Sequence, residues 1–102
     1  MKLKDLAKVI RSKNAGPFYV TLDVMFSDAE TYQKVKATGT LNADLIASLY
    51  NVAPDKVRFF EYDPAYSFKA TIPRRIVSGD FGDTDSYGAQ QHAPLLDVEI
   101  SL

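Results

Sequence analysis

The sequence predicts a small α+β domain, a two-layer sandwich in which helices cover one face of a small mixed sheet. Residues 18–26 alternate between apolar and mixed positions, which is typical of a strand. Two helical patterns follow at 28–38 and 42–50, and two shorter strand patterns at 57–62 and 68–72. A β-αα-β connection is right-handed, so its two strands should be parallel, and the two later strands should form a hairpin. The expected arrangement is close to a ferredoxin-like one, with a long loop in place of its second helix.

Length and composition predict one domain spanning residues 1–102 and exclude several classes of protein. Twelve Lys and Arg against 13 Asp and Glu give a net charge of −1, which does not favour a nucleic-acid binder. No apolar run approaches the roughly 20 residues of a membrane span. The lack of Cys excludes a disulfide framework and a Cys zinc site, and a single His excludes a multi-His metal site within one chain. The start of the chain lacks the pattern of a signal peptide, so we expect a cytoplasmic protein.

The first helix and the first strand are both predicted from apolar spacing. The expected helix ends near Ser12, because Gly16 and Pro17 follow. Its apolar face has the i, i+3, i+4, i+7 spacing and consists of Leu3, Leu6, Ala7 and Ile10. The strand that follows should bury one wholly apolar face, made of Phe18, Val20, Leu22, Val24 and Phe26.

Local signals predict where the next two helices begin and end. Ser27 and Glu30 have the spacing of a capping box, so they should start the helix over residues 28–38. Gly39 should end that helix, Asn42 should cap the next one, and Asn51 should take the left-handed geometry at its end.

The last part of the chain is expected to be a turn, a strand, a long loop and a final strand. The turn lies at residues 63–65, and Pro73 should end the pairing of the strand before it or place that strand at an edge. Residues 74–94 show no convincing period and are rich in Gly and Asp, and a loop of that length is uncommon unless functional. Residues 96–102 alternate again and predict the final strand.

Residues 11–17 are the first candidate for a binding site. Backbone amides before a Gly-Pro break can form an anion-binding nest, and Arg can hold a carboxylate or phosphate with two hydrogen bonds. The alternative is that the cations are there because they stabilise the C-terminal end of a helix. The candidate ligand-binding residues are Arg11, Ser12, Lys13, Asn14 and Gly16.

A Gly- and Asp-rich segment, residues 78–88, is the second candidate. Its carboxylates, Asp80, Asp83 and Asp85, could hold Mg²⁺ or Ca²⁺, because hard cations prefer oxygen ligands. Counted as an EF-hand from Asp83, however, the twelfth residue is Pro94 and not the required Glu. The alternative is that these carboxylates pair with nearby Arg and Lys side chains. No other cofactor is implied.

His92 is the third candidate, because His can act as a general acid or base near neutral pH. Gln90 and Gln91 precede it and would fix its orientation, whereas Asp83 and Asp85 are the other candidate proton carriers. The alternative is a hydrogen-bonding His in a polar loop. No triad or metal cluster is complete in the sequence, so catalysis would need a partner. We expect Arg11 and His92 to lie within roughly 15 Å of each other. They would meet within one chain if the strands that follow the two segments are parallel neighbours, and across a subunit contact if those strands are antiparallel.

The segments at residues 10–18, 82–85 and 88–96 resemble the signatures of a small bacterial family of unknown function. The chain is similar over essentially its whole length to the small ferredoxin-like domain that accompanies AtuA-type proteins, which are named for acyclic terpene utilisation. The resemblance implies an AtuA-type large partner and a setting in organic-acid or CoA-ester catabolism. It assigns no catalytic residue.

Three functions follow as hypotheses. The first is a small subunit that docks on an AtuA-type large chain and helps form a site for an organic acid or CoA ester, with hydratase or dehydratase (hydro-lyase) chemistry. In it Arg11 or Lys13 holds a substrate carboxylate, and His92 or an Asp moves a proton. The second is a self-contained homo-oligomeric enzyme, and the third a non-enzymatic anion-binding regulatory module. Aromatic residues around 59–68 should pack in the core or, where exposed, form an interface.

Overall fold

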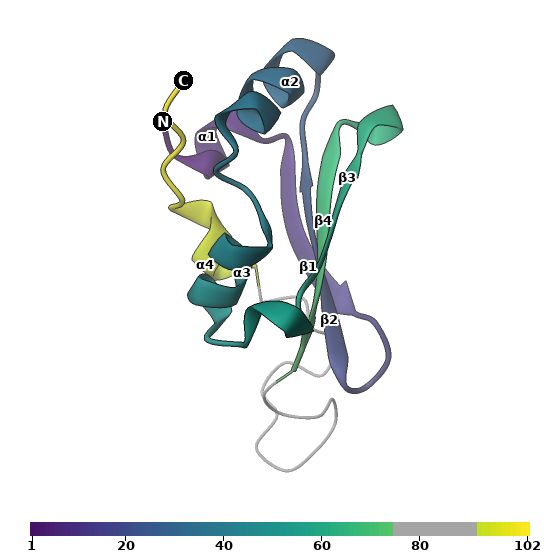
Figure 1. Ribbon diagram of the computed structural model, residues 1–102. Helices are drawn as coiled ribbons and strands as arrows, with labels where there is room; N and C mark the ends of the chain where they lie inside the picture. Colours follow the sequence, from purple (N-terminus) through teal and green to yellow (C-terminus); the bar gives the residue numbers. More distant parts are fainter. Residues whose placement is uncertain (75–91) are drawn as a thin grey trace.

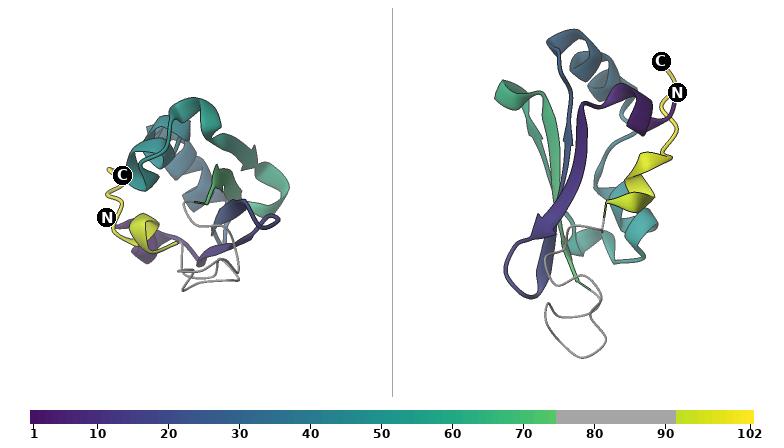
Figure 2. Two further views of the ribbon diagram at one scale, coloured as in Figure 1. Left: turned by 90° about the horizontal axis from the view of Figure 1, so that it is seen from below. Right: turned by 180° about the vertical axis from the view of Figure 1, so that it is seen from behind.

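A computed structural model describes residues 1–74 and 92–102, which form an α+β domain. Four strands make one sheet in the order β1-β2-β4-β3, and the helices cover one of its faces (Figures 1 and 2). Neighbouring strands are antiparallel in every pair, so the sheet is antiparallel and not mixed. The expected parallel sense of β2 and β3 is present, because β4 lies between them and is antiparallel to both. The elements are α1 (Leu3–Leu6), β1 (Val9–Asn14), β2 (Tyr19–Met25), α2 (Ala29–Thr38), α3 (Ala43–Tyr50), the 3₁₀ turn η1 (Pro54–Lys56), β3 (Arg58–Tyr62), the 3₁₀ turn η2 (Asp63–Ala65), β4 (Ser67–Pro73) and α4 (Ala93–Leu96).

The N-terminal segment corrects the first sequence prediction. Only Leu3–Leu6 are helical, and Val9–Asn14 form an edge strand paired with β2. The spacing of Leu3, Leu6 and Ile10 fits a helix, but a helix this short is barely stable by itself. Ladder hydrogen bonds to β2 and the packing of the partly buried Ile10 against the core outweigh that weak local preference.

The C-terminal segment corrects the prediction of a final strand over residues 96–102. Residues 93–96 form α4, and no described residue after them belongs to a strand of the sheet. The alternation of the segment still has a consequence, since Val98 and Ile100 are buried. The tail runs beside the N-terminus: the amide of Leu3 donates to the carbonyl of Val98 at 2.8 Å, and that of Ile100 to Met1 at 2.8 Å (Figure 1). β1 occupies the edge of the sheet beside β2, where a final strand could have paired.

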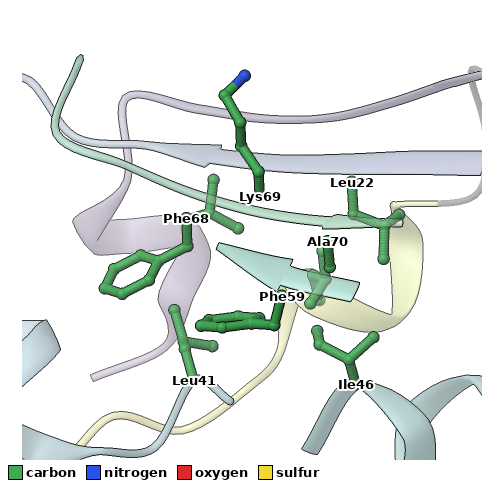
Figure 3. Close-up of a pocket in the computed structure, with 9 residues that line it drawn as sticks. Leu22, Leu41, Ile46, Phe59, Phe68, Lys69 and Ala70 are labelled. Atoms are coloured by element: carbon green, nitrogen blue, oxygen red, sulfur yellow. The ribbon is translucent and has the colours of Figure 1, made fainter. Parts of the chain in front are cut away.

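The core lies between the sheet and its helices, as the alternation in residues 18–26 predicts. Four of the five apolar residues on that face are buried, and Phe18 is the exception at 58% exposed, because it precedes β2 in the β1–β2 turn. Figure 3 shows side chains from the sheet, α3 and the segment before it packed together, with Lys69 extending away from them. The void they leave is only about 10 Å³, so the core is filled. Its sheet-side members are Val20, Leu22, Val24, Phe26, Phe68, Ala70 and Ile72.

The predicted ends of α2 and α3 are confirmed except at one position. Asn42 accepts a hydrogen bond from the amide of Leu45 at 2.8 Å, and Gly39 and Asn51 have φ values of 68° and 55°. The cap of α2 is Asp28, not Ser27: the Asp28 carboxylate accepts from the amide of Thr31 at 2.7 Å. A carboxylate caps a helix start as well as a hydroxyl does and also interacts favourably with the helix dipole. Pro73 is the last residue of β4, a central strand, so it ends the pairing.

Asp63, in η2, is connected to α2 by two hydrogen bonds. The hydroxyl of Tyr32 donates to its carboxylate at 2.6 Å, and the Lys36 ammonium donates at 3.1 Å. These contacts, the Tyr32 hydrogen bond first, lower the pKa of Asp63 below its ordinary value. The hydrogen bond to Thr31 lowers the pKa of Asp28 in the same way.

We therefore expect acid to destabilise the protein in a specific pH window. A carboxyl group whose pKa is lower in the folded than in the unfolded state stabilises the fold fully above the unfolded pKa of about 4. That stabilisation is lost as the pH falls from about 4 through the folded pKa. The variant Asp63→Asn should be less stable than the wild type at pH 6 and lose less stability between about pH 4 and pH 2. Urea denaturation along a pH series measures this, and an unchanged acid slope would contradict it. Asp55→Asn, at an exposed position, is the matched control.

Candidate functional site

The described helices leave the opposite face of the sheet uncovered (Figures 1 and 2). Alternation along each strand and the register between strands determine which side chains lie on it. One row across the sheet is Arg11, Asp23, Lys69 and Phe60. The next is Lys13, Thr21, Thr71 and Arg58. We call this surface the open face.

A buried carboxylate lies at the centre of the open face. Asp23, on β2, has 0% of its surface exposed. Its Oδ2 accepts a hydrogen bond from Arg11 Nε on β1 at 3.0 Å, and its Oδ1 accepts from Lys69 Nζ on β4 at 3.2 Å. Both cations are themselves partly exposed. The two ion pairs therefore join three strands and leave the trio with one net positive charge.

Aromatic side chains surround this trio. Tyr19, Phe60 and Tyr62 lie on the open face and remain 48–56% exposed. The ammonium of Lys69 lies 6.0 Å from the centre of the Tyr62 ring, which is within cation–π range. Phe59 and Phe68, in contrast, face the helices and pack on each other with ring centres 6.0 Å apart. Phe59 and Phe68 thus pack in the core, as the sequence predicts for this group, whereas Phe60 and Tyr62 are exposed.

A shallow cleft of about 560 Å³ opens at one end of this face. Its volume is in the range of small-molecule sites. Lys56 and Arg58 line it and form no salt bridge with any residue of the described ranges. The walls are completed by Ala15, Tyr19, Asp55, Phe60, Thr71 and Pro73.

Alternation along β1 divides the first candidate segment between two faces. Arg11 and Lys13 point to the open face, whereas Ser12 is buried on the helix side. Asn14 accepts a hydrogen bond from Arg74 Nη1 at 2.5 Å, and Gly16 has a φ of 78° in the β1–β2 turn. The alternative in which the cations stabilise a helix end is wrong, because they lie on a strand. Arg11 is held by Asp23 of its own chain.

The other candidates are only partly described. Asp80, Asp83, Asp85, Gln90 and Gln91 lie outside the described residues, together with Arg75. His92 immediately precedes α4, is half-buried and has an interaction partner. α4 packs against α1 and α3 on the helix side, whereas Arg11 lies on the open face. The meeting of Arg11 with His92 stays a prediction.

Two further searches cover residues 1–74 and 92–102. No three His, Asp or Glu side chains in these ranges gather as metal ligands. No helix there combines the length and apolar character needed to cross a membrane.

Asp23 is the central residue of the site that the sequence did not single out. It stands in a strand as one polar residue among several, and its partners lie 12 and 46 residues away in the chain. The signal that could have found it is a cation at the position opposite Asp23 on a neighbouring strand. This signal can be used only when residues 9–14 are predicted to be a strand.

Comparison with known proteins places the chain in one family. The model of the family described as "Domain of unknown function (DUF4387)" matches residues 3–99. The chain belongs to the DUF4387 family. No curated protein and no solved structure matches it. The residues of this DUF4387 protein that the family model matches include every strand of the sheet, and thus the whole open face.

Proposed function

We propose that this DUF4387 protein is a small subunit that docks through its open face on an AtuA-type large protein. The observation that carries the proposal is the open face itself, a four-stranded surface with exposed aromatic residues around an ion-paired, buried Asp23. Exposed apolar groups gathered on one face of a small domain mark interaction sites. Tyr and Phe are also enriched at protein interfaces.

The site is organised before any partner binds. Asp23 holds Arg11 and Lys69, and Lys69 lies beside Tyr62, so three strands contribute side chains whose positions are already restrained. Restraint of this kind lowers the entropy cost of association. The resemblance of the chain to the small domain of AtuA-type proteins supplies the identity of the partner.

In the assembled complex we place an organic acid or its CoA ester at the cleft, and the reaction is a hydration or dehydration. Lys56, in the wall of the cleft, offers the cation for a carboxylate or phosphate group. Lys13 lies on the same face, whereas Arg11 is engaged by Asp23. Asp83 or Asp85 moves the proton, because His92 precedes α4 on the helix side and does not line the cleft. The cleft also favours a second candidate function, an anion-binding regulatory module without catalysis.

The first test is complex formation. Co-expressed with an AtuA-type large protein, the chain should co-elute with it on size exclusion at micromolar concentration, and the complex should act on hydroxy acids or CoA esters. Separate elution would rule out the docking. Activity of the isolated chain would favour the self-contained homo-oligomeric enzyme. Ligand binding by a complex that shows no activity would favour the regulatory module.

We expect the aromatic residues to dominate the docking affinity. The double variant Phe60→Ala and Tyr62→Ala should weaken the complex at least about tenfold, because buried aromatic anchors typically contribute more than 1 kcal/mol each. Leu102→Ala is the matched control, since Leu102 is 58% exposed but lies in the C-terminal tail, on the helix side. Isothermal titration of the purified components measures both. Equal affinities for the two variants would place the interface elsewhere.

A further inference from the structure

We infer that the surface that docks on the open face is acidic, with carboxylates around an apolar centre. The inference rests on the proposed function and names the chemistry of the partner. It starts from the charges on the strands. Among the described residues, the strands place four cations and one carboxylate on the open face, hence a net charge of +3, whereas the whole chain has −1. These residues are Arg11, Lys13, Arg58, Lys69 and Asp23.

The arrangement of these charges is as informative as their sum. Asp23 is occupied on both oxygens by its own chain, so it offers nothing to a partner. Lys13 and Arg58 lie at opposite ends of one row and make no salt bridge with a described residue. Three strand spacings separate them, or about 14 Å. Thr21 and Thr71 lie between them, and Phe60 is in the neighbouring row.

A second copy of the chain fits this surface poorly. A twofold dimer through the open face would place the same patch on itself, so that +3 would meet +3. Like charges that are juxtaposed across an interface repel each other and oppose association. The occupant is therefore a different surface, and carboxylates on it would neutralise Lys13 and Arg58.

Nucleic acid is the other polyanion that such a face could bind. Aromatic residues on an open sheet can stack single-stranded bases, and cations can follow the phosphates. The net charge of −1 on the whole chain opposes this, because nucleic-acid-binding domains are typically strongly basic. The observations favour a protein surface, and nucleic acid becomes an outcome of the test.

The test measures the salt dependence of the complex with the large protein and the effect of charge reversal. The dissociation constant should rise at least about tenfold between 50 and 500 mM NaCl, because salt screens exposed charges. Lys13→Glu and Arg58→Glu should each weaken binding at 50 mM NaCl about tenfold and make the salt dependence less steep. Lys8→Glu is the control, since Lys8 is exposed but precedes β1 and lies off the open face, and it should change affinity less than twofold. Circular dichroism checks that each variant is folded.

A second measurement separates this inference from the proposed function. The ¹⁵N-labelled isolated chain is titrated with poly-L-glutamate, and with oligo-uridine as the alternative probe. Amide shifts from poly-L-glutamate confined to β1, β3 and β4 would support an acidic occupant even if no complex with the large protein forms. If the dissociation constant of the complex changed neither with salt nor with either charge reversal, the inference would be overturned and the docking would stand. Specific shifts from oligo-uridine on this face, or a dimer in sedimentation that Arg58→Glu strengthens, would also overturn it.

Discussion

Replacing Leu22 with alanine is expected to lower the free energy of unfolding by about 2–5 kcal/mol. Leu22 is 1% exposed, on the helix-side face of β2, and contacts the core from the middle of the sheet. The core has no room to compensate, because the void that Leu22 lines is only about 10 Å³. The variant therefore leaves a cavity in addition to the lost burial, and both terms destabilise the fold.

Phe18→Ala is the control for this prediction. Phe18 belongs to the same apolar stripe in the sequence, but its ring is 58% exposed. Its replacement should change stability by no more than about 0.5 kcal/mol, as is usual at the surface. Denaturant melts of the two variants compare a buried and an exposed member of one stripe. A Leu22→Ala loss below about 0.5 kcal/mol would mean that the helix side of β2 is not the core.

The parts of the fold that the sequence predicted well are those decided within a few residues. Gly39, Asn42 and Asn51 act on backbone groups of their own helix end, so the local chain contains the whole signal. The strand at residues 19–25 was found because alternation over that length specifies a buried face. Even the wrong prediction of Ser27 as the N-cap of α2 differs from the observed cap, Asp28, by only one residue.

The parts that failed are those decided by distant partners. Residues 9–14 have apolar spacing that fits a helix when it is read from Leu3, and only pairing with β2 makes them a strand. The tail after Leu96 alternates like a strand, but the edge it would join is taken by β1, so it pairs with the N-terminus instead. Tertiary context of this kind overrides local propensity.

The candidate site follows the same division. The sequence predicts that the aromatic residues around 59–68 pack in the core or, where exposed, form an interface. The sequence does not predict the trio around Asp23, because it places Arg11 on a helix and because Lys69 lies 46 residues after Asp23 in the chain. A cross-strand ion pair becomes visible only when the register is known.

The trio leads to the second prediction with a large expected effect. The double variant Arg11→Met and Lys69→Met should be destabilised by about 3–5 kcal/mol, because it leaves the carboxylate of Asp23 buried with no cation. Asp23→Asn alone should cost only about 1 kcal/mol, since the two cations are partly exposed and can be solvated. Removing the acceptor is thus expected to cost less than removing its partners.

The triple variant, Arg11→Met, Asp23→Asn and Lys69→Met, decides whether charge is the cause. It loses more side-chain groups than the double variant, yet it should regain most of the lost stability because no buried charge remains. Lys13→Met and Lys56→Met, at two exposed cations, should each change stability by no more than about 0.5 kcal/mol. Urea denaturation at pH 7 measures the whole set. If the triple variant were as unstable as the double one, Arg11 and Lys69 would be stabilising the sheet by packing over Asp23, and the carboxylate would not depend on their charge.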